Sequence, residues 1–395
     1  MIHLHVAMFS DSYLPYVSGA VRSLERLAAG LRDRGHTVTI FVPTYRGYSD
    51  SENAATIERC SSIPIYAPAH LVLALPRPGW ALARLRELGV DIVHTHSPAT
   101  LGRTAVSVGR KLDVPVVFTH HSVYHEYACY APAFLQPLAR RAIVRWISGF
   151  CRSVDQVIAP SHNTQEYIRR TYGLESAVVS NPIPAAGAAE AAVATAAAPS
   201  DGAHMAAPTK DMRRPVLIYA GRLAPEKNLS LLIEAFAAIR AQREAQLVLV
   251  GDGPERARLT ALAQKFHVES DMTITGFLPY DELLAWYAKA ALFLFPSSKE
   301  TQGMVILEAM AQGVPAVAVN SPVNAEVLQL SGAGWLAPTQ PAAMAEAVVR
   351  ALADPERLKQ VAAQGRQYAG KFTTANVAAQ VEAVYNRLIV NRSIR

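Results

Sequence analysis

Cysteine is scarce in this sequence: only Cys60, Cys129 and Cys151 occur among 395 residues, and they lie far apart. Three separated cysteines exclude a disulfide framework, and the lack of a CxxC pair leaves no zinc or redox motif. We expect them to be buried or inactive thiols in a reducing compartment. Long hydrophobic runs are also missing, because nowhere do about 18 apolar residues follow one another, as a membrane-spanning helix would require. Any role at a membrane must therefore be peripheral.

A large excess of charge of either sign is absent too. The formal net charge is +6 and only 18% of residues are charged, a mildly basic balance that excludes neither nucleic acid nor a membrane as partner. The hydrophobic fraction of 51% is enough for full cores and argues against disorder. The length suits two domains better than one. Residues 1–15 lack a basic flank and a cleavage site, so they predict a first strand rather than a signal peptide.

Short apolar runs alternate with helical patterns in both halves of the chain. Apolar residues recur at helical spacing from position 17 to 31, for example. The order strand, helix, strand indicates parallel sheets with helices on both faces, that is, two doubly wound α/β domains. Strands are predicted at residues 2–9, 37–42, 92–96, 114–119 and 154–159, and again at 216–220, 247–250, 272–275, 291–295 and 316–319.

An alanine-rich stretch separates the two halves. We interpret residues 181–214 as a linker or insertion, with a short helix as the alternative. The predicted domains are therefore residues 1–180 and 215–370, followed by a helix within 371–395 that returns to the first domain. Ligands of such proteins bind at the carboxyl ends of the strands, so the site is expected in a cleft between the two sheets.

The strongest signal for chemistry is SSKETQGMVILEAMAQGVP at residues 297–315, which follows a predicted strand and opens a helix. Unpaired backbone N–H groups around Gly303 would form an anion site that glycine lets a ligand approach. The carboxylate of Glu300 can accept hydrogen bonds from sugar hydroxyls, and that of Glu308, about two turns into the helix, from a ribose. Alternatively, Glu300 satisfies the helix dipole and Glu308 is a surface residue.

This stretch resembles the E-x7-E motif of the retaining GT-B glycosyltransferases, the family-4-like group 1 that includes glycogen-synthase-like, sucrose-synthase-like and lipid glycosyltransferases. The resemblance implies two Rossmann-like domains that face a central cleft, and a nucleotide-sugar donor. A second motif, GRLAPEKN at residues 221–228, also resembles the family, where its Arg and Lys grip the diphosphate. The resemblance gives that role to Arg222 and Lys227, whose charges would stabilise the leaving diphosphate.

Further loops resemble donor-side loops of the family. Residues 9–20 resemble its first loop, and this places Gly19 close to the donor phosphates. GDGP at 251–254 and GFLP at 276–279 resemble loops near the nucleotide, although a lone GxG is weak evidence and can mark only a turn. The donor-binding residues that the resemblance implies are Gly19, Arg222, Lys227, Gly251, Phe277, Leu278, Glu300, Thr301, Gln302, Gly303, Met304 and Glu308.

The resemblance places the acceptor side at two strand ends of the first domain. THHSVYHEY at residues 119–127 resembles the loop whose histidine faces the reacting sugar, and His121 matches it better than His120. DIVHTHS at 91–97 resembles another acceptor-side strand end. The implied catalytic set is His121, Glu300, Arg222 and Lys227, with His96, His120 and Tyr124 on the acceptor side.

A metal site is the alternative use of the five histidines at these strand ends. We expect no metal, because the family works without one and because the DxD motif of metal-using glycosyltransferases is missing. No cofactor is expected besides the nucleotide-sugar donor. The histidines are His94, His96, His120, His121 and His125.

The acceptor is suggested by ETQG at residues 300–303, which is similar to bacterial glucosyltransferases that act on diacylglycerol. A basic helix agrees with this: Ala139, Ala142, Ile143, Trp146, Ile147 and Phe150 follow helical spacing, and Arg141, Arg145 and Arg152 fall on the opposite face. Such a helix can lie on an anionic bilayer. A core-packed helix with a solvated arginine face explains the pattern equally well, and both interpretations can hold.

These observations predict a retaining, metal-independent hexosyltransferase that moves glucose from UDP-glucose to a lipid hydroxyl such as that of diacylglycerol. It would be cytoplasmic, peripheral at the inner face of the membrane, and without a nucleic-acid partner. Alternatives are a soluble acceptor, or an inositol lipid with a mannosyl donor. A nucleotide-sugar 2-epimerase shares the fold but does not need E-x7-E with ETQG, and the intact set of Arg222, Lys227, Glu300 and Glu308 argues against a non-catalytic binding protein.

Overall fold

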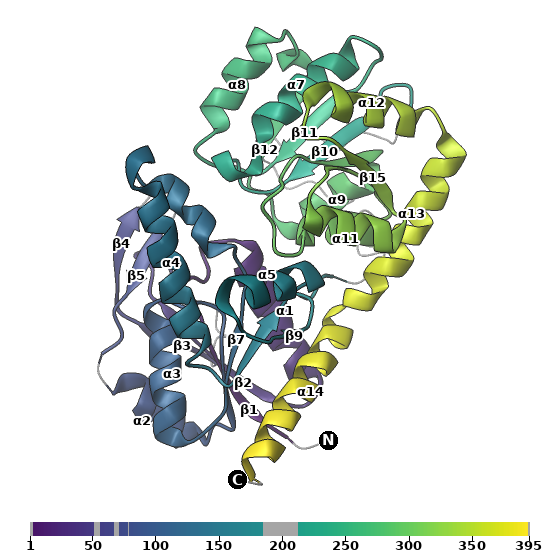
Figure 1. Cartoon of the computed structure of the whole chain (residues 1–395). Helices are drawn as coiled ribbons and strands as arrows, with labels where there is room; N and C mark the ends of the chain where they lie inside the picture. The colour runs from purple at the N-terminus through teal and green to yellow at the C-terminus, as the bar shows by residue number, and fades with distance from the viewer. Residues whose placement is uncertain (1–2, 51–55, 67–70, 78, 185–211, 394–395) are drawn as a thin grey trace. The chain divides into compact units, whose positions relative to one another are not determined.

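The computed structural model describes residues 3–50, 56–66, 71–77, 79–184 and 212–393. The chain forms two compact units, one of residues 1–182 with 374–395 and one of residues 183–373. Most of the alanine-rich stretch, residues 185–211, lies outside the described residues. Each unit is a parallel sheet with helices on both faces, as the alternating pattern predicts (Figure 1).

The first unit has a seven-stranded sheet in the order β3-β2-β1-β6-β7-β8-β9, and every pair of neighbours is parallel. An antiparallel hairpin of β4 and β5 follows β3. The strands of this unit are β1 (His5–Phe9), β2 (Thr37–Pro43), β3 (Ile57–Cys60), β4 (Ser62–Tyr66), β5 (Leu71–Ala74), β6 (Ile92–Thr95), β7 (Val116–Thr119), β8 (Gln156–Ala159) and β9 (Ala177–Val178).

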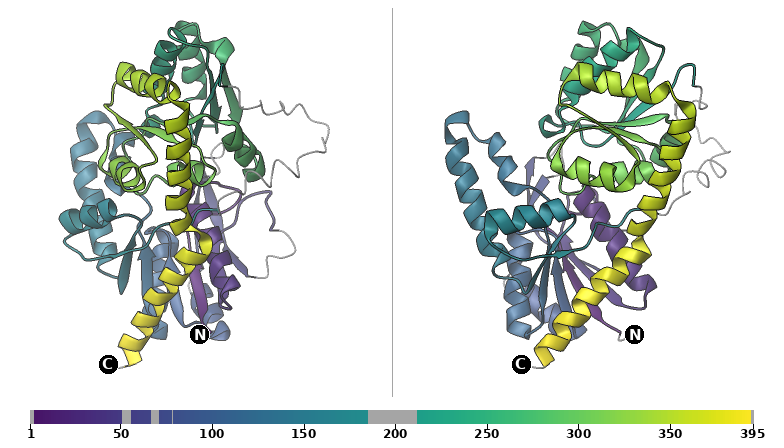
Figure 2. Two further views of the ribbon diagram at one scale, coloured as in Figure 1. Left: turned by 90° about the vertical axis from the view of Figure 1, so that its right-hand side faces the viewer. Right: turned by 45° about the vertical axis from the view of Figure 1, so that its right-hand side comes forward.

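Both faces of this sheet are buried, because successive side chains of a strand point to opposite faces and here both sets are apolar. In β1, Val6 and Met8 belong to one core cluster, and Ala7 and Phe9 to the other. The first cluster packs against α1 and α14, and the second against α2, α3, α4 and α5 (Figure 2). The helices are α1 (Gly19–Asp33), α2 (Trp80–Leu88), α3 (Thr100–Leu112), η2 (Tyr124–Tyr130), η3 (Ala133–Leu135), α4 (Gln136–Cys151), α5 (His162–Tyr172) and α14 (Thr374–Ser393).

The C-terminal helix α14 is fixed to the first unit by close packing and by polar contacts. A Cβ atom on Gly30 of α1 would lie 2.7 Å from the Thr374 side chain, so a glycine is needed where the two helices meet. Farther along, the Arg34 guanidinium pairs with the buried carboxylate of Glu382 at 2.5 Å. The chain therefore ends on the unit in which it begins.

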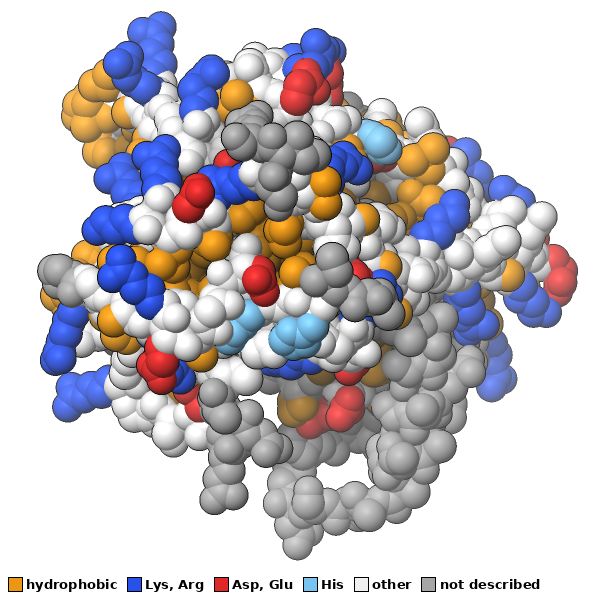
Figure 3. Space-filling model, turned by 90° about the horizontal axis from the view of Figure 1, so that it is seen from below, with side chains coloured by type: hydrophobic (Ala, Val, Ile, Leu, Met, Phe, Trp, Pro, Cys, Tyr) orange, Lys and Arg blue, Asp and Glu red, His pale blue; other side chains and the backbone are white. Residues whose placement is uncertain are grey.

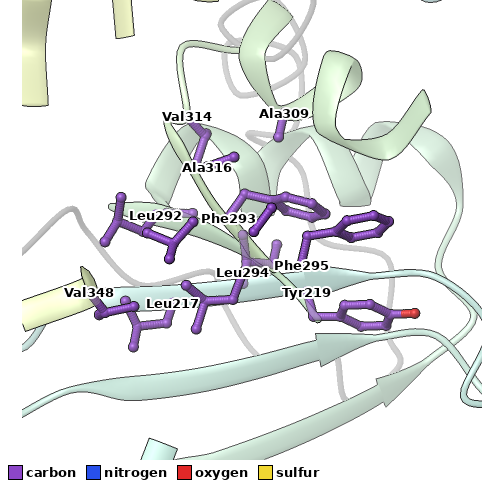
Figure 4. Packing of buried hydrophobic residues seen from close by; sticks show 14 of the residues in the cluster. Leu217, Tyr219, Leu292, Phe293, Leu294, Phe295, Ala309, Val314, Ala316 and Val348 are labelled. Carbon is purple, nitrogen blue, oxygen red and sulfur yellow. The ribbon is translucent and has the colours of Figure 1, made fainter. Parts of the chain in front are cut away.

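The second unit has a six-stranded parallel sheet in the order β12-β11-β10-β13-β14-β15. Its core is one apolar cluster, and Figure 4 shows the side chains of β13 packed with those of β10. The strands are β10 (Val216–Ala220), β11 (Gln246–Val250), β12 (Met272–Gly276), β13 (Leu292–Phe295), β14 (Ala316–Val319) and β15 (Gly334–Ala337). The helices are η4 (Pro225–Lys227), α7 (Leu229–Arg240), α8 (Arg256–Lys265), η5 (Glu269–Asp271), α9 (Tyr280–Lys289), α10 (Met304–Ala311), α11 (Pro322–Ser331), α12 (Pro341–Leu352), α13 (Pro355–Ala369) and η6 (Gly370–Phe372).

Candidate active site

The candidate donor site of the second unit lies where the strand order reverses. Strand β10 pairs with β11 on one side and with β13 on the other, so the loops that follow β10 and β13 leave the sheet next to each other. Open parallel sheets bind ligands at such switch points. The Lys227 ammonium, after β10, donates a hydrogen bond of 2.6 Å to Oε1 of Glu300, after β13. A charge-assisted contact thus joins the two predicted motifs.

Glu300 is also held by its own loop. The hydroxyl of the fully buried Ser297 donates to the same Oε1 atom at 2.8 Å. The side-chain amide of Asn324, on α11, donates to the backbone carbonyls of Ser297 and Val319, both at 2.9 Å. The other carboxylate oxygen, Oε2, accepts no hydrogen bond from the described residues. Glu300 is therefore fixed in position with one oxygen available to a ligand hydroxyl.

Arg222 lies in the same loop as Lys227, but its charge is not neutralised. Within the part of the chain that the structure describes, no carboxylate pairs with its guanidinium. Its backbone carbonyl accepts a hydrogen bond from the Tyr219 hydroxyl at 3.2 Å. Burial, followed by the charges of Glu300 and Glu226, raises the pKa of Tyr219 well above its usual value, so this phenol stays a donor. The loop is thus held in place while the guanidinium can meet an anion.

The start of α10 presents backbone N–H groups without a side-chain cap. Gly303 is the N-cap residue, in the left-handed region at φ 74°, and Thr301, Gln302 and Gly303 are buried. Met304 begins the helix and is partly exposed. Glu308 lies about one turn into the helix, not two, and is only 6% exposed, so the alternative that it is a surface residue is wrong. The uncapped N–H groups and the helix dipole suit an anionic ligand.

Two glycines of the loop after β11 let this loop pack against the loop after β10. A Cβ atom on Gly251 would lie 1.9 Å from the Gly221 carbonyl oxygen, and one on Gly253 would lie 2.3 Å from that of Leu223. These positions therefore require glycine for close approach of two backbones.

The two donor-binding residues predicted in the loop after β12 differ in their exposure to solvent. Phe277 is 65% exposed, whereas Leu278 packs against the core.

The loops after β1 and β6 meet at the corresponding switch point of the first unit. The Asp11 carboxylate accepts hydrogen bonds from the hydroxyls of Ser97 (2.6 Å) and Thr100 (2.7 Å) and from the Leu101 N–H (2.9 Å). Asp11 therefore ties the β1 loop to the start of α3. Gly19 is the first residue of α1 and is exposed, which leaves the start of this helix accessible.

A row of histidines follows β6 and β7 in the first unit. The rings of His94 and His96 stack with centroids 4.3 Å apart, and Nδ1 of His96 shares a hydrogen bond of 2.9 Å with Nε2 of His121. His94 is fully buried and shares hydrogen bonds with the hydroxyls of Tyr385 on α14 (2.6 Å) and Thr119 (2.7 Å). The geometry links the predicted His121 to the C-terminal helix through two further imidazoles, those of His96 and His94.

His120 and Tyr124, both predicted on the acceptor side, pack against each other in the first unit. His120 is fully buried, with Nε2 3.3 Å from the Tyr172 hydroxyl, and its ring meets the edge of Tyr124 at 5.1 Å between centroids. His121, by contrast, remains partly exposed. Of the two adjacent histidines, His121 is the one that a substrate can approach.

Burial keeps the imidazoles neutral at physiological pH. It lowers the pKa of His94 and His120 to about 3 each, with the nearby His121 adding to the effect. Burial also lowers the pKa of His121 to about 4 and that of His96 well below its usual value. A neutral imidazole can both donate and accept a hydrogen bond, which suits contact with a sugar hydroxyl.

The stability of the first unit should therefore fall as the pH decreases from about 6.5 towards 4. In this window the unfolded chain protonates these imidazoles while the native unit does not, so the unfolded state binds more protons. We expect the free energy of unfolding to drop by about 1.4 kcal/mol per pH unit for each of His94, His96 and His120. Urea unfolding with pulsed thiosulfonate labelling of the buried Cys60 and Cys151 would follow this unit alone.

His94→Gln should reduce the slope of the free energy of unfolding against pH by the contribution of one proton, about 1.4 kcal/mol per pH unit. His267→Asn is the matched control, because His267 is exposed on the second unit and its left-handed backbone, at φ 55°, tolerates asparagine. A free energy of unfolding that stays constant between pH 7 and 5 would contradict this account.

Helix α4 is only partly a core helix. It buries Ile147, Phe150 and Cys151, whereas Arg141 and Arg145 are exposed and Trp146 is 37% exposed. Arg152 follows the end of the helix, and its guanidinium donates to the Tyr172 carbonyl at 2.6 Å. Arg152 therefore joins α4 to α5, a role that the sequence pattern did not indicate.

The described residues contain no group of three His, Cys, Asp or Glu side chains that could hold a metal ion. They also contain no helix with the length and apolar character needed to cross a bilayer.

Comparison with known proteins matches both units. The model of Glycosyltransferase Family 4 matches residues 17–186, and that of Glycosyl transferases group 1 matches residues 201–368. The GDP-mannose-dependent alpha-mannosyltransferase of Mycolicibacterium smegmatis is 30% identical over 325 residues, which cover 80% of this chain and 79% of the relative. The chain therefore belongs to the glycosyltransferase family that these two models describe, the one with a Family 4 domain followed by a group 1 domain.

A second curated relative and a solved structure are also similar to this chain. The alpha-monoglucosyldiacylglycerol synthase of Streptococcus pneumoniae is 29% identical over 329 residues, 81% of this glycosyltransferase and 72% of the relative. The structure of Anabaena HepE in complex with UDP and glucose superposes with a TM-score of 0.73 at 18% identity and covers 98% of this chain and 100% of that chain. The GT-B fold is therefore shown, with two Rossmann-like domains.

Sequence reasoning missed several supporting residues of the glycosyltransferase. Ser297, Asn324 and Tyr219 hold the two donor-site loops, and Asp11 anchors the β1 loop. Ser297 and Asp11 lie inside stretches that the motifs already cover, so only their roles were missed. Asn324 lies 24 residues beyond Glu300 in another helix, and no local pattern connects the two.

Proposed function

We propose that this glycosyltransferase moves glucose from UDP-glucose to the hydroxyl of a membrane lipid such as diacylglycerol, with retention, to give an α-glycolipid. The Lys227–Glu300 contact beside the unneutralised Arg222 and the uncapped start of α10 carries the donor part of this proposal. The lipid acceptor is supported by similarity to an alpha-monoglucosyldiacylglycerol synthase. The nucleotide is supported by the likeness to a structure that holds UDP and glucose.

The proposed chemistry assigns charge stabilisation to the donor loops. As the bond between the anomeric carbon and the phosphate oxygen breaks, negative charge grows on the diphosphate. Arg222, Lys227 and the N–H groups that follow Gly303 would stabilise it, and those near Gly19 would add to this. Glu300 would orient the sugar through its available oxygen, and Glu308 would hold the ribose. Gly251, Phe277, Leu278, Thr301, Gln302 and Met304 would line the nucleotide and sugar.

The acceptor hydroxyl would approach from the face that the diphosphate leaves. Its oxygen forms the new bond to the anomeric carbon, and its proton passes to a phosphate oxygen of the departing nucleoside diphosphate. No protein base is needed for that step, which is consistent with a neutral His121. We assign His121 to a hydrogen bond with the reacting sugar, and His96 to orienting it through their shared hydrogen bond. No metal is required in this scheme.

Membrane contact is proposed at the start of α4, from the cytoplasmic side. Phe134 on η3 is 81% exposed and Tyr130 at the end of η2 is 64% exposed. Leu138, which is 66% exposed, lies on α4 together with the exposed Arg141. Exposed apolar side chains beside arginines suit an anionic interface. On the face shown in Figure 3, hydrophobic side chains are likewise exposed among basic ones.

A mannosyl donor is the second candidate, because one relative is a GDP-mannose-dependent alpha-mannosyltransferase. The experiment that separates the two is an assay for released nucleoside diphosphate. UDP-glucose, UDP-galactose and GDP-mannose would each be offered with and without diacylglycerol in anionic vesicles. We expect lipid-dependent release from UDP-glucose. Release only from GDP-mannose would overturn the proposed donor. Release that is equal with and without diacylglycerol would overturn the proposed acceptor.

A further inference from the structure

An open groove of about 630 Å³ runs between α3 and α4 on the first unit. Helix α3 contributes Arg103, Val106 and Arg110, which are spaced three and four residues apart and so share one helix face. Two turns of α4 form the other wall. Two residues predicted on the membrane side, Arg145 and Trp146, line this groove, whereas none of the donor-site residues does.

The wall formed by α4 combines small and aromatic residues. Gly149 opens the groove, because a Cβ atom at this position would have no atom within 4 Å. Trp146 and Phe150 lie on either side of it along the helix face. Trp146 is 37% exposed and Phe150 is buried at 6%. The groove therefore offers apolar surface in a space that a narrow chain can enter.

Three guanidinium groups surround this apolar surface. Arg103 lies with its guanidinium carbon 5.9 Å from the centre of the Trp146 ring, and Arg110 donates only to the Ser153 carbonyl at 3.3 Å. Within the described residues, no carboxylate pairs with Arg103, Arg110 or Arg145, and no acidic residue lines the groove. The nearby Arg140 differs, since it pairs with Glu126. Three like charges with no counter-charge favour an anionic ligand.

We propose that the α3–α4 groove binds one anionic phospholipid, with its phosphodiester among the three guanidinium groups and its acyl chains along Trp146 and Phe150. Charge complementarity selects the phosphate, and the apolar wall selects a ligand with hydrocarbon next to that phosphate. The inference rests on the membrane part of the proposed function, and it is independent of the sugar donor. The protein would then bind the membrane in two ways: through a single phospholipid held in the groove, and through the attraction between its basic residues and the negative surface charge of the bilayer.

The test uses the whole protein and lipids too short to form a bilayer, so that the surface charge of a membrane plays no part. Calorimetric titration would compare monomeric dihexanoyl phosphatidylglycerol, dihexanoyl phosphatidylcholine and inorganic phosphate. We expect phosphatidylglycerol to bind at least tenfold more tightly than either of the others. Replacing Arg103, Arg110 and Arg145 with glutamine should weaken it by about fivefold each and about a hundredfold together. Arg86→Gln, an exposed arginine on α2, is the matched control and should leave the affinity unchanged.

A second variant keeps every charge and fills the space. Gly149→Leu fits the helix without a clash and should raise helix stability, yet it should weaken phosphatidylglycerol binding at least tenfold. Equal binding of inorganic phosphate would overturn the lipid assignment, as would equal binding of phosphatidylcholine or full affinity in Gly149→Leu. UDP affinity should stay unchanged in all variants. Failure of wild-type protein to bind UDP would count against the proposed donor and not against this groove.

Discussion

Replacing Lys227 with alanine is expected to lower kcat/KM for glucosyl transfer by about a thousandfold. The ammonium is fixed at 2.6 Å from Glu300, in the loop that leads into α10, and in the proposed reaction charge develops on a leaving group held there. Its loss removes a preorganised cation from the transition state and also leaves Glu300 without its main partner. Steady-state rates with saturating acceptor vesicles would measure the effect, which should fall mainly on kcat.

The pair should behave as one unit. Glu300→Gln alone should lower kcat/KM at least a hundredfold. The double variant Lys227→Ala with Glu300→Gln should lower kcat/KM by much less than the product of the two single effects. Lys359→Ala is the control, because this lysine lies on the surface of α13 with 74% of its side chain exposed, and it should change the rate by less than twofold. Fully multiplicative effects would show that Lys227 and Glu300 act independently, contrary to the contact in the structure.

Replacing Arg222 with alanine is expected to lower kcat by a hundredfold or more and to weaken binding of UDP at least tenfold. The reason is that this guanidinium has no carboxylate partner among the described residues, so its charge is fully available to a diphosphate. Calorimetric titration with UDP measures the binding part directly. Protein stability should change little, since the side chain makes no ion pair that folding would lose.

Lysine at position 222 should restore only part of the lost affinity, because an ammonium cannot form the two parallel hydrogen bonds of a guanidinium. Arg258→Ala is the matched control, since Arg258 pairs only with Glu255 on the surface of α8. Normal UDP affinity in Arg222→Ala would remove Arg222 from the donor site.

The double α/β architecture could be predicted because parallel strands buried on both faces leave continuous apolar runs in the sequence. The resemblance placed Lys227 and Glu300 at the same donor site, but it did not predict the contact between them, and 73 residues separate the two in the chain. Only the strand order, with β10 between β11 and β13, brings their loops together. Topology of this kind is set by packing of the whole sheet and leaves no local signal.

Other features had no pattern that the sequence could show. The hairpin of β4 and β5 was not predicted, and it exposes Ile63, Ile65 and Leu73, which a hydrophobic count assigns to the core. The helical spacing of Trp146 left core packing and membrane contact open, and its side chain lines an open groove because Gly149 leaves the space unfilled. The prediction that Arg145 lies on the opposite face from Trp146 is wrong, because both residues line this groove. Whether such a side chain is buried or exposed depends on neighbours that are distant in sequence.

The most direct test of the proposed function is the structure of the product. The protein would be incubated with UDP-[13C]glucose and diacylglycerol in anionic vesicles, and the lipid fraction would be examined by NMR at the anomeric carbon. We expect one new glycolipid with glucose in α linkage to the glycerol hydroxyl, formed in amounts equal to the UDP released. A β-linked product would contradict retention, and UDP release without any lipid-linked sugar would contradict the lipid acceptor.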